Sequence, residues 1–328
     1  MKDRIITNKI LNWYDINKRV LPWRKNVSHK KKQYYTLVSE FMLQQTQVAT
    51  VVPYFNRFIK NIPDLETLAN FENQKLIKLW EGLGYYSRVR NLKKTAKIII
   101  DKFKGKLPSN EEDLKSLPGI GEYTSRAIMA IAFNKKIIPL DGNVERVLKR
   151  VFYLKKDKEI SKENLHKKKT FFEETIRASD YAQAIMEIGA LICKPYNPLC
   201  YQCPISTNCK SFKKNDFEIV KINKFNKQKF FEANIFQNKQ NNYYLLKNRK
   251  FNFLKDMPIF PMNEIPKTKF KNHLGKRINI KMSNMDMKIA INMKNNLPEK
   301  SDGFFINVKD LSNWTLPSFT KKILNTIK

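Results

Sequence analysis

The four cysteines of this 328-residue chain all lie between residues 193 and 209, in the sequence CKPYNPLCYQCPISTNC. The spacing is Cys193-x6-Cys200-x2-Cys203-x5-Cys209, and clustered cysteines in an intracellular protein bind metal more often than they form disulfides. Structural zinc usually shows two close C-x2-C pairs, and only Cys200 and Cys203 make one. Four thiolates on one unequal loop suit an iron–sulfur cube, whose corners lie farther apart than the ligands of one ion. The spacing therefore favours an iron–sulfur cluster, with zinc and then a disulfide as alternatives.

Two glycines, Gly119 and Gly121, lie in the sequence LPGIGEYTSR between two segments of helical periodicity. Upstream, Ser109 with Glu112 three residues later predicts a capping box, and downstream EYTSRAIMAIAF places its apolar residues on one face. A Walker loop or a dinucleotide loop does not fit, because a Gly-Lys-Ser/Thr ending and a third glycine are missing. The pattern predicts a helix–hairpin–helix whose backbone N–H groups approach a phosphate, with a simple tight turn as the alternative.

Two carboxylates have neighbours that suit acid–base chemistry. Glu40 lies in SEFML beside apolar residues, so burial is expected to raise its pKa and let it donate a proton near neutrality. The alternative is a first-turn residue that completes a helix cap with Ser39. Asp141 lies in LDGNVERV at the start of a predicted helix, where it is either a simple N-cap or a functional carboxylate.

The chain carries 63 Lys and Arg against 30 Asp and Glu, a formal net charge of +33 that favours a polyanionic partner such as nucleic acid. A compositional bias is the alternative, because lysine also abounds in tracts without motifs, such as KINKFNKQKF. The length suits two domains. No apolar run reaches the eighteen residues of a membrane span, and the N-terminus lacks the apolar core of a signal peptide. We therefore expect a soluble cytoplasmic protein that does not bind membranes.

The cysteine spacing, LPGIGEYT and LDGNVERV together resemble the helix–hairpin–helix glycosylase superfamily that includes endonuclease III. Within it, SEFMLQQTQVATVVPYF, WEGLGYYSRVRNL and LPWR are similar to adenine DNA glycosylases of the MutY type. The resemblance covers residues 5 to about 210. It implies a mostly α, two-lobed glycosylase domain over residues 1–213, which binds DNA across a cleft and holds a [4Fe–4S] cluster on the loop 193–209. Its implied substrate is adenine mispaired with 8-oxoguanine or guanine.

The resemblance also implies roles for individual residues. Glu40 matches the general acid, and Asp141 matches the carboxylate that stabilises the sugar cation. Asn143 matches a residue that holds Asp141 or its water. Tyr123 stands where strand-cutting relatives have a lysine that forms a Schiff base with the sugar, which a phenol cannot do. A monofunctional glycosylase that leaves an abasic site is therefore implied.

Further positions match residues that contact DNA or the flipped adenine in this family. The segment Gln44-Gln45-Thr46 resembles the part that probes the base opposite adenine. Tyr85 and Tyr86 offer a wedge for the gap that the flipped base leaves, with core packing as the alternative. The positions that match the lining of the adenine pocket are Trp23, Arg24, Leu43 and Glu187. The last of these could accept a hydrogen bond from the adenine amino group.

Two stretches depart from the family pattern. SHKKKQYYT, between LPWR and Glu40, is predicted as a longer basic surface loop. After a basic linker at 214–229, residues 230–328 alternate short apolar and polar runs (FFEANIF, NYYLLKN, KRINIKM, GFFINV) and end in a helical segment, LPSFTKKILNTI. They resemble a degenerate Nudix-like α+β domain. Only Leu274-Gly275-Lys276 after His273 stands where the family has its 8-oxoguanine-reading loop.

We expect a monomer that binds double-stranded DNA containing A:8-oxoguanine or A:G mispairs and is associated with a bacterial nucleoid. Two other functions remain as alternatives. An endonuclease III-like glycosylase with lyase activity is opposed by Tyr123 and by the QQTQ segment. A catalytically inactive DNA-binding protein that keeps the cluster for structure is opposed by the intact Glu40 and Asp141.

Overall fold

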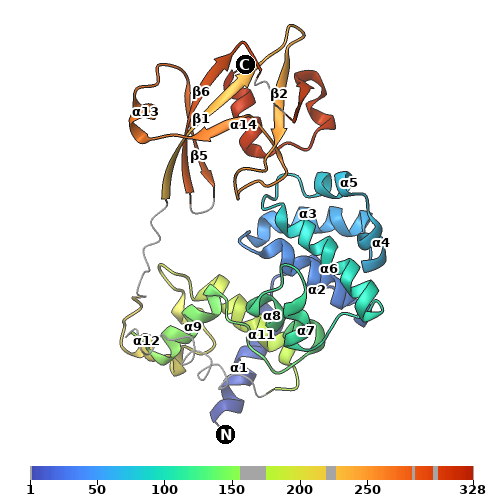
Figure 1. Ribbon diagram of the computed structural model, residues 1–328. Coiled ribbons are helices and arrows are strands. Elements are labelled where there is room, and N and C mark those ends of the chain that lie inside the picture. Colours follow the sequence, from blue (N-terminus) through green and yellow to red (C-terminus); the bar gives the residue numbers. More distant parts are fainter. Residues whose placement is uncertain (1, 156–174, 219–226, 283–284, 298–301, 328) are drawn as a thin grey trace. The chain divides into compact units, whose positions relative to one another are not determined.

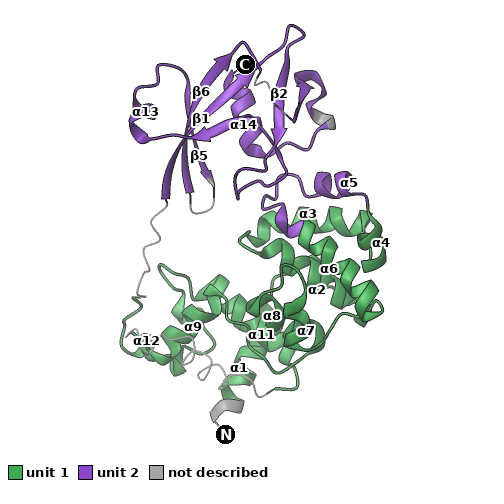
Figure 2. Ribbon diagram, viewed as in Figure 1, with its two compact units in different colours: residues 1–71, 90–221 green, residues 72–89, 222–328 purple. Residues whose placement is uncertain are grey.

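The computed structural model describes residues 2–155, 175–218, 227–282, 285–297 and 302–327. The chain divides into two compact units, shown in different colours in Figure 2. Unit 1 comprises Met1–Phe71 and Arg90–Lys221, and unit 2 comprises Glu72–Val89 and Ile222–Lys328. Each unit is described separately below.

Unit 1 is helical (Figure 1). Its elements are α1 (Lys2–Asn17), η1 (Pro22–Arg24), α2 (His29–Leu43), α3 (Val48–Asn61), α4 (Leu65–Asn70), most of α6 (Ser87–Phe103), α7 (Glu111–Ser116), α8 (Glu122–Phe133), α9 (Gly142–Phe152), α11 (Ala178–Glu187), η3 (Ile188–Ile192), η4 (Cys200–Gln202), η5 (Ser206–Asn208) and α12 (Lys210–Lys213). The α5 helix (Asn73–Leu79) and the first residues of α6 belong to unit 2.

The basic stretch SHKKKQYYT is the first half of α2, so the surface loop predicted there is wrong. Ser28 is the N-cap, and its hydroxyl accepts a hydrogen bond from the Lys31 backbone N–H. Apolar residues continue one helical face through the stretch, because Tyr34, Leu37 and Phe41 are all buried at helical spacing. Burial of that face outweighs the run of lysines, whose side chains reach water from the opposite face.

The predicted helix–hairpin–helix consists of α7, the loop Leu117–Gly121 and α8. The cap of α7 is Asn110, whose Oδ1 accepts from the Asp113 backbone N–H at 2.9 Å, so the capping box predicted from Ser109 and Glu112 is wrong. An Asn side chain caps as well as a serine, which moves the start of the helix by one residue.

One apolar core of unit 1 joins α1, α9 and α11. Its buried members include Ile10, Tyr14, Leu148, Tyr181 and Ile185, and three cysteines pack against its edge. The apolar residues of α9 predicted to face inward are all buried: Val144, Val147, Leu148 and Val151. Burial of this stripe therefore fixes the orientation of α9, the helix that begins at Asp141.

Unit 2 contains the predicted strands in two sheets (Figure 1). The strands are β1 (Lys227–Phe236), β2 (Asn242–Lys247), β3 (Pro258–Ile259), β4 (Met262–Glu264), β5 (Arg277–Met282), β6 (Met285–Lys294) and β7 (Gly303–Asn307). One sheet has the order β4-β1-β6-β5 and the other β3-β2-β7. The β1–β6 pair is parallel, and the other pairs are antiparallel.

Three short helical elements accompany the sheets of unit 2: α13 (Lys267–Lys271), η6 (Val308–Asn313) and α14 (Ser318–Ile327). The core packs strand residues such as Phe231 and Ile289 against Phe319 and Ile323 of α14. Lys321 Nζ lies 2.6 Å from Glu81 Oε1 and joins the two segments of the unit. Of the linker predicted at 214–229, residues 219–226 lie outside the described residues. Within the described chain, no helix has both the length and the apolar character that a bilayer crossing needs.

Candidate active site and cysteine cavity

A cavity of about 1210 Å³ lies in unit 1 and is lined from α1, η1, α2, α8, α9 and α11. It brings together most of the predicted site residues: Trp23, Arg24, Glu40, Leu43, Gln44, Gln45, Thr46, Tyr123, Asp141, Asn143 and Glu187. Four predicted residues do not line it: Tyr85, Tyr86, Gly119 and Gly121.

Glu40 lies in the last turn of α2 and is 6% exposed. The alternative of a first-turn cap is therefore wrong. Burial raises the pKa of Glu40 to about 7, the charge of Asp141 raises it further, and the charge of Arg24 opposes the shift. Near neutrality a large fraction of Glu40 is thus protonated, which suits a proton donor.

Asp141 is the N-cap of α9, and its side chain also faces the cavity. Its Oδ1 accepts from the Val144 backbone N–H at 2.7 Å, and its Oδ2 accepts from the Asn143 amide at 3.1 Å. Burial raises the pKa of Asp141, and these two donors lower it. The N-cap and the functional carboxylate are therefore compatible alternatives, because one carboxylate has oxygens for both.

Glu187 ends α11 and is buried between two arginines. Arg19 donates to both carboxylate oxygens, at 2.7 and 2.8 Å, and Arg24 Nη2 lies 3.0 Å from Oε1. Burial favours a raised pKa for Glu187, but the hydrogen bonds and charges of the two arginines lower its pKa below the ordinary value. Arg24 Nε is buried and has no hydrogen-bond partner among the described residues. It is a donor left over at the cavity wall.

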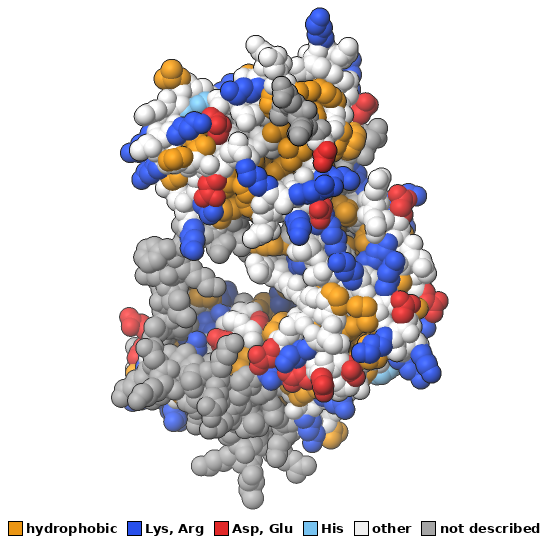
Figure 3. All heavy atoms as spheres, in the orientation of Figure 1, with side chains coloured by type: hydrophobic (Ala, Val, Ile, Leu, Met, Phe, Trp, Pro, Cys, Tyr) orange, Lys and Arg blue, Asp and Glu red, His pale blue; other side chains and the backbone are white. Residues whose placement is uncertain are grey.

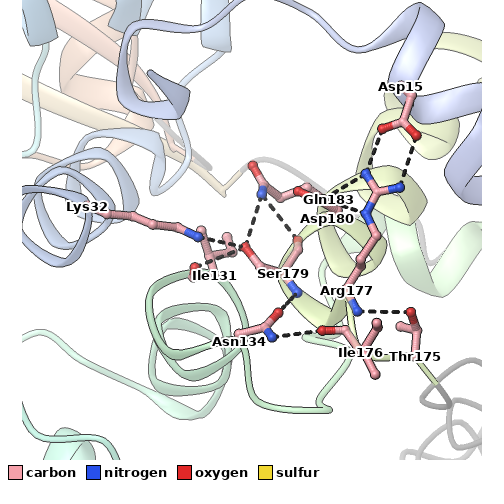
Figure 4. A network of polar contacts seen from close by, with 10 residues as sticks. All are labelled: Asp15, Lys32, Ile131, Asn134, Thr175, Ile176, Arg177, Ser179, Asp180 and Gln183. Carbon is pink, nitrogen blue, oxygen red and sulfur yellow. Dashed lines mark hydrogen bonds and ion pairs between the residues drawn. The ribbon is translucent and has the colours of Figure 1, made fainter. Parts of the chain in front are cut away.

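A polar network behind the cavity ties four helices together (Figure 4). Ser179 is at its centre: the backbone N–H donates to Asn134 Oδ1 at 2.8 Å, and the hydroxyl donates to the Ile131 carbonyl at 3.0 Å. Lys32 Nζ on α2 lies 3.4 Å from the same hydroxyl. Gln183, which lines the cavity, donates to the Ser179 carbonyl at 3.2 Å. The network holds α2, α8 and α11 in fixed register around the cavity.

Sequence reasoning missed Arg19, Lys32 and Gln183. The signal available for Gln183 was its spacing of four residues from Glu187, which places both on one face of α11. Arg19 has no such local signal, because its partner lies 168 residues away. Lys32 was assigned to a surface loop, and its position on α2 brings it to the cavity instead.

The hairpin glycines have different reasons for being glycine. Gly119 has φ of 83°, and a Cβ there would meet Phe41 Cε1 at 2.9 Å, so both conformation and packing require it. Gly121 is the N-cap of α8, and a Cβ there would meet nothing within 4 Å. Gln44 Nε2 donates to the Gly119 carbonyl at 3.1 Å, which connects the cavity to the hairpin. No side chain caps α8, so its first N–H groups face open space.

The two tyrosines of the predicted wedge separate. Tyr85 is 40% exposed, whereas Tyr86 is 5% exposed and packs in the core. The core-packing alternative is therefore correct for Tyr86, and Tyr85 alone is available at the surface.

All four cysteines line a second, smaller cavity of unit 1. None is in a disulfide. Among the described residues, no three His, Cys, Asp or Glu side chains are placed to hold a single metal ion. Arg150 is buried at the edge of this cavity, with Nη1 3.4 Å from Cys193 Sγ and 2.6 Å from the Lys194 carbonyl. Four free thiols spread around one cavity, with a cation beside them, fit an anionic group larger than one ion.

The chain that follows the last cysteine returns over this cavity. Phe217 lines it, and Arg150 Nη2 donates to the Phe217 carbonyl at 3.1 Å. Asp216 accepts from the Tyr153 hydroxyl and from Lys155 Nζ, both at 2.7 Å. The described start of the predicted linker is therefore held against α9.

Helix α9 and the π-helical turn η3 connect the two cavities. Arg146 donates to Asn143 Oδ1 at 2.7 Å and to the Cys193 carbonyl at 2.6 Å. The turn η3 follows Glu187 directly and precedes Cys193 directly. A Cβ on Gly189 would meet Asn143 Cβ at 2.7 Å, so this turn and the start of α9 are in close contact.

Unit 2 has a cavity of about 770 Å³. Its lining includes the segment predicted to replace the reading loop, His273, Leu274, Gly275 and Lys276, together with Glu232 and Asn292. His273 Nε2 lies 3.1 Å from the Ile291 carbonyl, and the Asn292 amide donates to Glu232 at 2.6 Å. Leu274 is fully exposed at the tip of the loop.

Comparison with known proteins now identifies the fold and the family. Residues 38–170 match the model of the HhH-GPD superfamily base excision DNA repair proteins. The solved structure of a thermostable thymine-DNA glycosylase aligns with 65% of this chain and 97% of that one, with 28% identity and a TM-score of 0.56.

Two curated relatives from Buchnera aphidicola are named adenine DNA glycosylase. The relative from strain Bp is 41% identical over 216 residues, which is 66% of this chain and 60% of that protein, so the match spans less than two thirds of its length. The relative from strain Sg is 33% identical over 353 residues and is matched over 99% of both chains. This chain therefore belongs to the adenine DNA glycosylase family of helix–hairpin–helix base excision DNA repair proteins.

Proposed function

We propose that this chain is a monofunctional DNA glycosylase that removes adenine paired with 8-oxoguanine or guanine. One observation carries the proposal: Glu40 and Asp141 face the same cavity, and burial with the Asp141 charge raises the pKa of Glu40 to about 7. Of two coupled carboxylates, the one with the lower pKa ionises first and the other keeps its proton. Asp141, with two donors on its oxygens, takes the ionised role, and Glu40 takes the acidic one.

The reaction follows from these two states. A duplex hides the glycosidic bond, so the adenine is flipped into the cavity. Glu40 gives its proton to the imidazole ring of the base, and the C1′–N9 bond breaks with its electron pair going to the departing adenine. The sugar becomes oxocarbenium-like, and the Asp141 carboxylate stabilises that charge. Water then attacks C1′, and Glu40, now ionised, accepts the proton that the water loses.

The cavity wall supplies donors and acceptors for the flipped base. Arg24 Nε is a buried donor without a partner among the described residues, and Glu187 is the acceptor for the adenine amino group. Glu187 remains anionic between Arg19 and Arg24, which strengthens it as an acceptor. The segment Gln44-Gln45-Thr46 is the candidate for the base opposite adenine, because Gln45 is exposed and Gln44 is anchored to the hairpin.

Tyr123 supports the monofunctional proposal. Burial and the charges of Glu40 and Asp141 raise the pKa of Tyr123 well above its usual range, so the phenol stays neutral. A neutral phenol forms no Schiff base with the sugar, and hydrolysis by water is the path that remains.

DNA binding is supported by charge and by the hairpin. Lys and Arg side chains are spread over the described face drawn in Figure 3, in both units, which favours sequence-independent phosphate contacts. The uncapped N-terminus of α8 adds backbone N–H groups for one phosphate. All proposed site residues come from one chain, and we propose that the protein works as a monomer on DNA in the cytoplasm.

Cys193, Cys200, Cys203 and Cys209 are proposed to hold a [4Fe–4S] cluster, because all four line one cavity beside Arg150. The cluster is expected to hold the loop 193–209 in place rather than to take part in base removal. Iron analysis of anaerobically prepared protein should give four iron atoms per chain with brown colour. Zinc without iron would contradict the cluster and support the structural-zinc alternative.

The activity is tested by adenine release from four duplexes with A opposite 8-oxoguanine, G, C or T. We expect release from the first two, and strand cleavage only after alkali. Strand cleavage without alkali would favour the glycosylase/lyase alternative. Mispair binding without release from any duplex would favour the inactive DNA-binding alternative.

A further inference from the structure

Tyr85 lies in a turn with an unusual backbone. Gly82, Gly84 and Tyr85 have φ of 98°, 74° and 46°, so three of four successive residues are left-handed. Glycine adopts this region freely, but a tyrosine does so at a cost that surrounding contacts must offset. The conformation leaves the Tyr85 ring at the surface, while its neighbour Tyr86 enters the core.

Arg88 lies directly beneath this turn. Its Nη2 donates to the Leu83 carbonyl at 3.1 Å and to the Gly84 carbonyl at 3.2 Å. Its guanidinium carbon lies 5.3 Å from the centre of the Tyr85 ring and 5.5 Å from that of Trp80. The Trp80 indole donates to the Gly84 carbonyl as well, at 3.0 Å. Arg88 thus contacts both the backbone and the side chain of the strained turn.

Arg88 is placed to act within the protein rather than on DNA. It is 6% exposed, so its charge does not reach a phosphate. Burial lowers the pKa of Arg88 to about 10, which still leaves the guanidinium charged at neutral pH. A charged, planar group that stacks on a ring and donates to two carbonyls fixes a turn in a way that lysine cannot reproduce.

We propose that Arg88 is a positioning residue for base flipping: it holds the turn 82–85 so that the Tyr85 ring is already aimed outward when DNA arrives. The proposal rests on the proposed glycosylase function, in which Tyr85 enters the gap left by the flipped adenine. A preformed wedge removes the ordering cost that a mobile tyrosine would meet during insertion.

The test is a double-mutant cycle with Arg88→Lys, Tyr85→Ala and the pair, followed by single-turnover adenine release from the A:8-oxoguanine duplex. Each single variant should slow release by about tenfold or more, because an inserted side chain offsets the unstacking of bases. The pair should be no slower than Tyr85→Ala, within about a factor of three, because Arg88 acts through that ring. Slowing by the product of the two single effects would overturn the proposal.

The control is Arg57→Lys, because Arg57 lies over the Tyr54 ring, 4.7 Å from its centre, on α3 outside the turn. It should release adenine at the wild-type rate. If Arg57→Lys slowed release as much as Arg88→Lys, the effect would belong to arginine–tyrosine contacts in general, and the proposal would fail.

A second measurement separates Arg88 from the proposed function. Amide hydrogen exchange of residues 82–86 in the DNA-free protein should be faster in Arg88→Lys, with an unchanged melting temperature. Unchanged exchange would overturn the positioning role even if the enzyme is active. Faster exchange in a protein that releases no adenine from any duplex would support the clamp and contradict the glycosylase function instead.

Discussion

Residues 2–218 and residues 227–327 differ in what they bury. In the first region Glu40, Arg88, Arg150 and Glu187 are buried, and in the described part of the second the buried polar side chains are Asn248 and Thr320, which carry no charge. The second region has an ordinary core of aromatic and aliphatic residues. A buried charge is costly unless it is paired, so such groups are retained where they do something that an apolar residue cannot.

The difference assigns different tasks to the two regions. Each buried charge of residues 2–218 lies at a cavity wall or under the Tyr85 turn, and each changes what that site can do. Residues 227–327 offer lysines and a loop at the surface instead. We infer that chemistry depends on the helical region, whereas the β-rich region contributes binding.

The largest effect is expected from Glu40→Gln. The amide keeps the shape and loses the proton, so adenine release should fall by about a hundred- to ten-thousandfold while DNA binding is retained. Glu145→Gln is the matched control, because Glu145 lies on α9 and pairs only with Lys149 on the surface. Near-normal single-turnover release by Glu40→Gln would show that another residue supplies the proton.

The next effect is on the pH profile. Since the protonated form of Glu40 acts and its pKa is about 7, single-turnover release should fall above pH 7 and be about fiftyfold slower at pH 9 than at pH 7. Duplex binding is measured at each pH as the control. A flat profile with unchanged binding would mean that the proton does not come from a group with this pKa.

A smaller effect is expected from removing residues 227–328. Lysine contacts with phosphate give affinity without base specificity, so binding should weaken more steeply with rising salt for the full chain than for the truncated one. The preference for 8-oxoguanine over guanine should change by less than about tenfold, or roughly 1.4 kcal/mol. A larger loss, in truncated protein with a normal thermal transition, would show that the loop at 273–276 still reads the oxidised base.

The smallest effect concerns stability. The pKa of Glu40 is raised from 4.5 in the unfolded chain to about 7 in the fold, so its contribution is fully present below pH 4.5 and is lost as pH rises through 7. Glu40→Gln should therefore raise the melting temperature by a few degrees at pH 8 and change it little at pH 4.5. An equal shift at both pH values would contradict the burial of an ionised Glu40 at pH 8.

The sequence predicted features that depend on neighbouring residues. The strands β1, β2, β5 and β7 and the helix α14 lie where alternation and helical periodicity place them, because both patterns are local. The family motifs predicted which side chains meet in the large cavity. Their chemical roles stay predictions.

Contacts between distant segments were not predictable in the same way. Arg146 reaches the carbonyl of Cys193, 47 residues on, and Arg150 holds Phe217, 67 residues on. The arginines of α9 look like an exposed basic face in the sequence, and only the return of the chain from the cysteine loop buries them. The same return turns residues assigned to a linker into a wall of the cysteine cavity.

The π-helical turn η3 has a consequence for insertions and deletions. Such a turn holds one residue more than an α-helical turn, and here it separates Glu187 from Cys193. Deleting one of its residues would restore regular α-helix and rotate everything beyond it by about 100°, carrying Cys193 away from its cavity. A substitution of Leu191 leaves that count unchanged. The number of residues between the pocket carboxylate and the first cysteine is therefore under stronger constraint than most of their identities, and genetic drift in this segment should accumulate as substitutions and never as changes of length.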